Sequence, residues 1–276
     1  MNSQEQQYPP EVYSLTREYT VTYTDIDFNG NLKFSQLLNI FQNISIAHGN
    51  MLGIFIFPLK ALDLAFVITN WRIVFHKPVK VEQKVNITTW IRKHKGSWLF
   101  RNYKVVDENG EILIDAAAQF LFMDLITKKP AEFIEGIINP VDRTIDSILL
   151  KEKFRIPKPR KENLYSEGKF VTGKSEIDFS MHINNSVYTD WAINQVPMEI
   201  YENKFLADTR ISYRKECKYD EEISVKTYIN ETDEGTEIIS VFSKFNGEKQ
   251  VMVAQINTLW IDGESYTCLP TDEEDE

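Results

Sequence analysis

The alternation of hydrophobic and polar residues divides the chain into two similar series of elements. In the first series, a strand-like run at residues 18–23 precedes a helical pattern, whose apolar stripe is Leu37, Phe41, Ile44 and His48. In the second series, a strand-like run at residues 169–172 precedes a helical pattern with Val187, Trp191 and Val196 on its stripe. Three further strand-like runs follow each helix, at 85–90, 99–106 and 112–122 and then at 223–229, 236–245 and 251–261. The chain therefore contains an internal repeat.

Local signals place the ends of these elements. Ser35 is a plausible N-cap of the first helix and Gly49 its stop, whereas Asn184 or Asn185 would cap the second helix before Pro197 disturbs its end. Asn-Gly pairs, the strongest short hairpin signal, lie between the later strands of both halves, at 109–110 and 246–247.

An apolar helix beside several strands is best buried by a curved antiparallel sheet that wraps around it. We therefore predict an α+β protein of two tandem hot-dog domains, each with a long central helix. The predicted N-terminal domain covers residues 12–140, and the C-terminal domain covers residues 165–265. A basic, proline-containing linker at 141–164 would join them, and an acidic tail would occupy 266–276.

Composition narrows the functional classes. The 276 residues are 42% hydrophobic and carry a net charge of −10, which disfavours binding to nucleic acid or to an anionic membrane. Two cysteines cannot form a disulfide framework and suggest a reducing compartment. The first ten residues lack the features of a signal peptide, and the longest apolar stretch, 52–59, is too short to span a bilayer. We expect a cytoplasmic protein without a membrane span; the oligomeric state stays open, a homodimer included.

One motif is misleading. Residues 168–175 match the phosphate-binding pattern Gly-x4-Gly-Lys-Ser, which requires an apolar strand before the loop and a helix directly after it. Here a polar segment precedes the match, and the next helix begins about ten residues later. We interpret it as a chance match within a strand. No metal or organic cofactor is expected, because the four histidines lie in no metal-binding motif.

The chemically informative stretch is residues 178–191. Asp178 and His182 lie four residues apart just before a predicted helix, so that both can join one site. His182 can act as an acid, a base or an orienting group near neutral pH. We also expect unpaired amides at the helix start to stabilise a developing oxyanion.

This stretch resembles the second repeat of the acyl-acyl-carrier-protein (acyl-ACP) thioesterases. That family carries Asp-x-Asn-x-His-Val-Asn-Asn-x-x-Tyr-x-x-Trp and, about thirty residues later, Tyr-Arg-x-Glu-Cys. The chain has Asp178, His182, Asn184, Asn185, Tyr188 and Trp191, and then Tyr213, Arg214, Glu216 and Cys217. The resemblance extends over about residues 15–262 and implies hydrolysis of fatty acyl-ACP in fatty acid biosynthesis.

The resemblance also implies roles for single residues. Asp178 would be the essential carboxylate near the thioester, His182 would position or polarise reacting groups, and Glu216 would assist attack by water. Cys217 matches a cysteine once interpreted as the nucleophile, a less favoured role. Ser180 stands where the family has a catalytic Asn and can replace only part of its hydrogen bonding. Four residues would contact the substrate: Asn184, Asn185, Tyr188 and Trp191.

The first half lacks most of this set. Asn31 stands opposite His182, Asn29 opposite Ser180, and Pro78 and Val79 opposite Glu216 and Cys217. We therefore expect one active site, from the second half. The first half would shape the acyl-chain pocket, with residues 52–68 as candidates for its lining.

Two functional alternatives remain: the protein hydrolyses acyl-coenzyme A, or it is a catalytically weak acyl-binding protein. An acidic acyl carrier protein would need a local basic patch to dock on this acidic chain. Candidates are Lys93 with Lys95, or the linker cluster of Lys153, Arg155, Lys158, Arg160 and Lys161.

Overall fold

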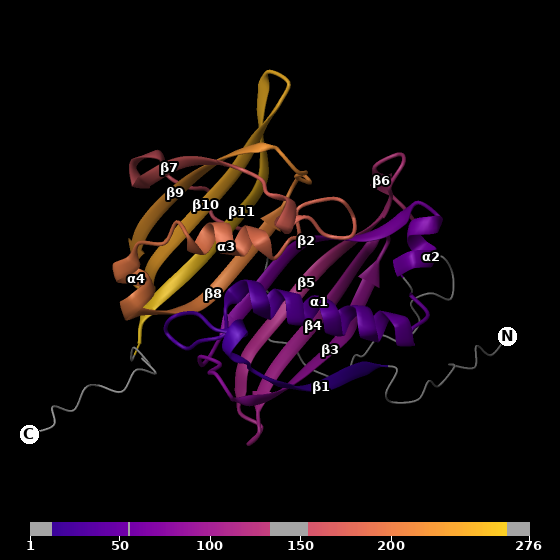
Figure 1. The fold of residues 1–276 in the computed structure, drawn as a ribbon, viewed down its shortest axis with the longest axis horizontal. Helices are drawn as coiled ribbons and strands as arrows, with labels where there is room; N and C mark the ends of the chain where they lie inside the picture. The colour runs from indigo at the N-terminus through magenta and orange to yellow at the C-terminus, as the bar shows by residue number, and fades with distance from the viewer. Residues whose placement is uncertain (1–12, 55, 133–153, 264–276) are drawn as a thin grey trace, which may run out of the picture.

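A single antiparallel sheet organises the protein (Figure 1). The computed structural model describes residues 13–54, 56–132 and 154–263. The first half contributes β1 (Ser14–Thr20), β2 (Leu64–Phe75), β3 (Lys84–Lys95), β4 (Trp98–Asp107), β5 (Ile112–Asp124) and β6 (Lys129–Pro130). The second half contributes β7 (Leu164–Val171), β8 (Lys204–Tyr213), β9 (Glu222–Thr232), β10 (Gly235–Asn246) and β11 (Lys249–Asp262). The strand order is β1-β3-β4-β5-β2-β8-β11-β10-β9-β7, and β6 pairs with β5.

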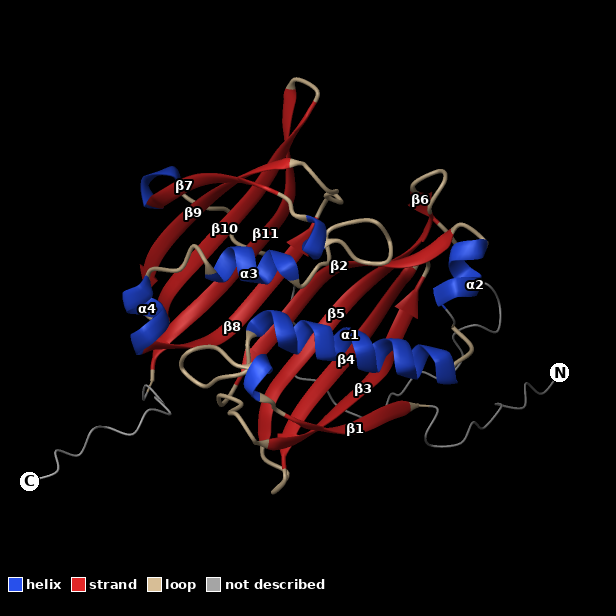
Figure 2. Ribbon diagram, viewed as in Figure 1, coloured by secondary structure: helices blue, strands red, loops and turns tan. Residues whose placement is uncertain are grey.

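Helices cover one side of this sheet, as Figure 2 shows. The α-helices are α1 (Phe34–Met51), α2 (Ile56–Ala61), α3 (Val187–Ile193) and α4 (Met198–Asn203). Short 3₁₀ turns lie at Tyr23–Asp25, Lys161–Asn163 and Lys174–Glu176. The sheet wraps around α1 in the first half and around α3 in the second (Figure 2). This arrangement confirms the predicted α+β class and the internal repeat.

The two halves meet where β2 pairs with β8, from Asn70 opposite Ser212 to Val74 opposite Asp208. Neither strand was among the predicted strand runs. Next to this seam, the Asp208 carboxylate accepts a 2.6 Å hydrogen bond from Arg72, with Arg210 Nε 3.5 Å from its other oxygen. The two predicted domains therefore share one continuous sheet. Most of the predicted linker and the whole acidic tail lie outside the described residues, and β7 begins at Leu164, the last predicted linker residue.

Aromatic side chains fill the space between helix and sheet. In the first half, Phe41 of α1 stacks on Trp71 and Tyr103, with ring centroids 5.8 and 4.5 Å away. In the second half, Trp191 of α3 lies 5.9 Å from the ring of Phe242. The predicted helical stripe of the first half is confirmed, since its four residues are all buried. Its most polar member, His48, lies 2.8 Å from a guanidinium nitrogen of the buried Arg101.

Both helices differ at their ends from the prediction. The first begins at Phe34 and ends at Met51, so Ser35 and Gly49 lie inside it, and Gly53 beyond it adopts a positive φ of 75°. The second has only seven residues and ends at Ile193, before Pro197, which is the N-cap of α4. The central helix of the second half is therefore short rather than long.

Other local predictions hold. Gly110 and Gly247 have φ values of 83° and 64°, as the two Asn-Gly turns require. The misleading phosphate-binding match runs from β7 into a 3₁₀ turn, and no α-helix follows it directly. Among the described residues, no helix has the length and apolar character needed to cross a membrane.

Candidate functional site

A tight loop before α3 brings the predicted catalytic residues together. The amide of Asp178 donates to the carbonyl of His182 at 2.8 Å, and Met181 closes the turn with a positive φ of 64°. The next residue, Ile183, donates its amide to the carbonyl of Cys217 at 2.8 Å. This bond fixes the loop against the segment after β8, so that His182 faces Glu216.

His182 and Glu216 form the central pair of the site. Their Nε2 and Oε2 atoms lie 3.1 Å apart, and the imidazole is 28% exposed against 45% for the carboxylate. Both groups are therefore fixed relative to each other while remaining open to a substrate and to water. An imidazole that donates Nε2–H to a carboxylate can orient it, and such a carboxylate can accept a proton from water.

Two lysines of the first half reach this site. Lys128, in the turn between β5 and β6, places Nζ 3.5 Å from the second oxygen of Glu216. Lys60 of α2 donates to the carbonyl of Phe179 at 3.2 Å, and its Nζ lies 4.0 Å from the centroid of the Phe179 ring. Both halves of the chain therefore form the surroundings of the loop at residues 178–182, the candidate catalytic loop.

Asp178 lies at the start of the same loop. One carboxylate oxygen accepts the amide of Ser180 at 2.7 Å, which fixes its orientation. The Ser180 side chain is exposed, so the position where the family has Asn lies at the open side of the loop.

The start of α3 differs from the expected oxyanion site. The side-chain oxygen of Asn184 accepts the amide of Ser186 at 2.9 Å, and the carbonyl of Asn184 accepts the amide of Val187 at 3.1 Å. The amide of Thr189 donates to Ser186. Because these amides are already bonded, the helix start does not offer them to a ligand. The N-cap is Ser186 rather than either asparagine, with Asn184 bonding to its amide.

Three predicted site residues belong to the core. Cys217 is fully buried, and this burial raises the pKa of its thiol, so the nucleophilic thiolate is disfavoured. Tyr188 and Trp191 are only 3% and 7% exposed, which leaves little surface for contact with a substrate. The indole of Trp191 donates to Glu176 at 2.9 Å, and Tyr213 donates to the carbonyl of Asn185 at 2.7 Å. These residues pack in the core beneath the loop and stabilise it.

The first half contains the same loop without the same chemistry. Three backbone hydrogen bonds recur, with N···O distances of 2.7 or 2.8 Å in every case. They join Asp27 to Asn31, Leu32 to Val79 and Lys33 to Asp25 in the first half, and Asp178 to His182, Ile183 to Cys217 and Asn184 to Glu176 in the second. The predicted equivalence of the two loops is thus confirmed, and Asn31 and Pro78 occupy the places of His182 and Glu216.

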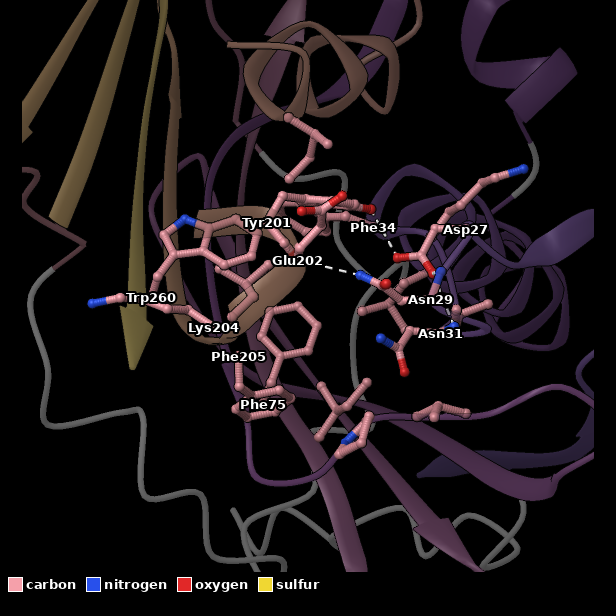
Figure 3. Close-up of a pocket in the computed structure, with 18 of the residues that line it drawn as sticks. Asp27, Asn29, Asn31, Phe34, Phe75, Tyr201, Glu202, Lys204, Phe205 and Trp260 are labelled. Atoms are coloured by element: carbon pink, nitrogen blue, oxygen red, sulfur yellow. Dashed lines mark hydrogen bonds between the residues drawn. The ribbon is translucent and has the colours of Figure 1, made fainter. Parts of the chain in front are cut away.

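Helix α4 closes the first-half loop (Figure 3). Tyr201 of α4 donates its hydroxyl to Asp27 at 2.8 Å, and its carbonyl accepts the side-chain amide of Asn29 at 3.2 Å. A cavity of about 130 Å³ remains beside them, lined by residues of both halves that include Asn31, Phe205 and Trp260. The carboxylate of Asp27 is therefore engaged by Tyr201 of α4, whereas Asp178 lies in an open loop.

An apolar region lies in the first half, around the ends of the segment that contains α2. Leu52, Ile54 and Phe66 pack there against the buried side chains of Ile91 and Leu99. Leu52, Ile54 and Phe66 belong to the segment that was predicted to line the acyl-chain pocket, residues 52–68. Since α2 also carries Lys60, this region adjoins the loop that contains Asp178.

Sequence reasoning did not identify Lys60, Lys128 or Glu176 as part of this site. Lys60 and Lys128 lie far along the chain from the residues they contact. Glu176 belongs to a polar run with no distinctive motif. For Glu176 a signal existed, because it precedes the Ile-Asp-Phe element that the two halves share, as Asp25 does. The two lysines carried no comparable signal.

Comparison with known proteins assigns both halves. The model of the acyl-ACP thioesterase N-terminal domain matches residues 12–141, and that of the C-terminal domain matches residues 160–262. The chloroplastic acyl-(acyl-carrier-protein) hydrolase FATB3 of Cuphea viscosissima is 24% identical over 234 residues, which cover 80% of this chain and 56% of that protein. The chloroplastic palmitoyl-acyl carrier protein thioesterase of Gossypium hirsutum is 24% identical over 243 residues, with coverages of 84% and 58%. The chain thus spans little more than half the length of these relatives.

Solved structures agree on the fold. An acyl-ACP thioesterase from Bacteroides thetaiotaomicron superposes with a TM-score of 0.77 at 21% identity, covering 90% of this chain and 97% of that one. The 12:0-ACP thioesterase from Umbellularia californica gives a TM-score of 0.78 at 18% identity, with coverages of 91% and 98%. The predicted tandem hot-dog architecture is confirmed.

Proposed function

Because the chain belongs to the acyl-ACP thioesterase family, we propose that it hydrolyses the thioester of a fatty acyl-ACP and releases a free fatty acid. The observation that carries this proposal is the pairing of His182 with Glu216 at 3.1 Å beside the Asp178 loop. A positioned carboxylate and an imidazole can activate water, which is the reactant that thioester hydrolysis requires.

The proposed reaction needs only water as co-reactant. A water molecule held by Glu216 attacks the carbonyl carbon, and the carboxylate accepts its proton. His182 keeps Glu216 in place by donating its Nε2–H to the carboxylate. The carbon–sulfur bond then breaks, the acyl group leaves as a carboxylic acid, and the proton that Glu216 accepted passes to the sulfur, which leaves as the thiol of the carrier.

In this proposal Asp178 supplies the essential carboxylate near the thioester. Its carboxylate is oriented by the Ser180 amide, beside the open face to which Ser180 itself belongs. Ser180 can donate one hydrogen bond where the family Asn presents an amide. Turnover that is slow relative to proteins with the Asn is the expected consequence.

The acyl chain is proposed to occupy the apolar region beside α2. Leu52, Ile54 and Phe66 offer a nonpolar surface within the first half, and Lys60 joins that half to the catalytic loop. A fatty acyl chain gains from such burial by about 0.8 kcal/mol per CH₂ group.

Two alternatives are separated by one assay. Purified protein is incubated with matched acyl-ACP and acyl-coenzyme A thioesters of several chain lengths, and thiol release is measured. We expect release from acyl-ACP to be faster. Faster release from acyl-coenzyme A would favour the alternative substrate, and absence of release from every thioester would leave an acyl-binding protein. Fractionation of source cells and size-exclusion chromatography with light scattering would test the proposed cytoplasmic location and a homodimer.

A further inference from the structure

The rim of the proposed site is basic although the chain as a whole carries a net charge of −10. Lys60 and Lys128 reach the rim from the first half through Phe179 and Glu216. On the side of the second half, exposed cations lie in the two segments that join the catalytic loop. They are Lys174, Arg214, Lys215 and Lys218.

Contacts hold the two segments of the second half together. Thr172 donates its hydroxyl to the carbonyl of Lys218 at 2.6 Å, which ties the end of β7 to the segment after β8. Lys174 places its Nζ 5.5 Å from the ring centroid of Tyr219. The six cations thus lie on the segments that carry His182 and Glu216 or reach them from the first half; we call them the basic collar.

The acidic groups within the collar are largely engaged. Glu216 is paired with His182 and Lys128, and Glu221 with Lys244 at 2.7 Å. Glu222 is paired with Lys169 at 2.8 Å on β7. Asp220, Asp178 and Glu176 add three negative charges, against the six cations of the collar. The balance of charges at the rim is therefore positive.

The collar also contains exposed apolar side chains. Phe179, Met181 and Tyr219 are 58%, 69% and 47% exposed and lie in or beside the catalytic loop. Protein interfaces commonly combine a few exposed aromatic or Met side chains with a charged rim that orients the partner. A small thioester would need neither feature outside the site.

We propose that the basic collar is the docking surface for an acidic carrier protein that delivers the acyl thioester. This proposal rests on the proposed function and adds the residues that recognise the partner. The partner presents acidic side chains to the lysines and a nonpolar patch to Phe179 and Met181, while its acylated arm enters between Asp178 and Glu216.

The linker cluster is less suited to this role. Along β8, Arg210 points away from Ile211, whose side chain belongs to the core. Arg210 and Gln255 donate to the carbonyls of Arg155 and Pro157, at 3.5 and 3.0 Å. The described part of the linker therefore lies against the outer side of the sheet, opposite the helices and the site.

The internal repeat supplies a matched control. Lys77 and Lys80 occupy in the first half the places of Lys215 and Lys218, as the shared bonds show: the amide of Lys77 donates to Leu113 and that of Lys215 to Val253. The variants Lys215→Glu/Lys218→Glu and Lys77→Glu/Lys80→Glu therefore carry the same change of charge in equivalent parts of the fold. Only the first pair lies in the basic collar.

The test compares both double variants with the unmodified protein on two substrates. One substrate is an acyl-ACP, and the other carries the same acyl group on N-acetylcysteamine, a small uncharged thiol. At low salt we expect Lys215→Glu/Lys218→Glu to lower kcat/KM for acyl-ACP by roughly tenfold or more, through KM. Hydrolysis of the small thioester should stay within about twofold, because the reacting groups are unchanged. The control variant should match the unmodified protein on both substrates.

Binding of ACP without an acyl group, followed by fluorescence anisotropy, provides a readout that does not depend on turnover. Weaker binding of the collar variant alone, and a loss of the difference in high salt, would support the proposal. Equal binding by all three proteins, or loss in the control or in Lys93→Glu/Lys95→Glu instead, would overturn it. If the unmodified protein binds ACP through the collar yet hydrolyses no acyl-ACP, the proposed function fails while the docking surface stands.

Discussion

The loops at residues 27–31 and 178–182 have the same backbone and different chemistry. Their hydrogen bonds correspond one by one, and a residue with positive φ, Gly30 or Met181, lies at the same point of each. Yet the first loop is closed by Tyr201 of α4, whereas the second carries His182, which is paired with the carboxylate of Glu216. The shared fold therefore gives both loops the same backbone position, and a few side chains determine which chemistry each loop can offer.

The asymmetry extends to the helices that cover the two loops. α4 seals the first loop with hydrogen bonds to Asp27 and Asn29. From α2, Lys60 contacts the second loop at the carbonyl and the ring of Phe179. The loop that lacks the histidine and carboxylate pair is thus the one that α4 bonds into the seam between the halves.

Replacing the two equivalent aspartates tests this comparison most severely. We expect Asp178→Ala to lower kcat by about 10³-fold, because it removes a group that acts on the reacting thioester. Asp27→Ala should leave kcat within about twofold. It should instead lower the free energy of unfolding by about 1–3 kcal/mol, since the donors of Asn29, Asn31 and Tyr201 lose their acceptor.

Steady-state kinetics and urea unfolding of both variants provide the measurement. Equal losses of activity in the two variants would mean that the loops are not functionally distinct.

The pair of His182 and Glu216 gives the second prediction. His182→Asn introduces the residue of the first loop, and Glu216→Gln removes the proposed base at nearly constant volume. Each is expected to lower kcat by about 10²-fold. The double variant should be hardly worse than either single variant, because the two groups act as a unit.

A double-mutant cycle on kcat measures this coupling. Additive effects of the two substitutions would separate the residues and contradict the proposed roles.

The repeat and much of the site could be predicted from the sequence because they are local. Periodic apolar stripes and Asn-Gly turns predict helices and hairpins, and Asp178 and His182 lie within one short loop. The pairing of Glu216 with His182 depends on Ile183 bonding to the segment after β8, which no local pattern shows. The motif of a known family placed Glu216 among the site residues instead, without predicting that pairing.

Features that depend on contacts between the halves could not be predicted in this way. β2 and β8 were missed because residues such as Asn70, Arg72 and Asp208 interrupt a simple apolar alternation at the seam. Lys60 and Lys128 reach the site only because the two halves share one sheet. The amides of Ser186 and Val187 are not available for the expected oxyanion role for a local reason, since they already donate to the side chain and the carbonyl of Asn184.

A third, smaller effect is expected from Ser180→Asn. Asn29 holds the equivalent place in the first loop, where its side-chain amide donates to the carbonyl of Tyr201. In the open second loop the same amide would be free to meet the substrate. One added hydrogen bond that forms in the transition state corresponds to a gain of about two- to tenfold in kcat/KM. Kinetics on acyl-ACP measure it, with Ser180→Ala as the control that should lose activity.

The smallest effect on activity is expected at Cys217, whose counterpart in the first half is Val79. The thiol is fully buried, burial raises its pKa, and its carbonyl rather than its sulfur holds the catalytic loop. Cys217→Ala should therefore leave kcat within about twofold, since the backbone bond to Ile183 remains. The small cavity should lower the free energy of unfolding by about 1 kcal/mol, as measured by urea denaturation. A loss of activity as large as that of Glu216→Gln, at unchanged stability, would instead indicate that Cys217 is the nucleophile. The first half, with Val79 at the corresponding position, would then lack that nucleophile.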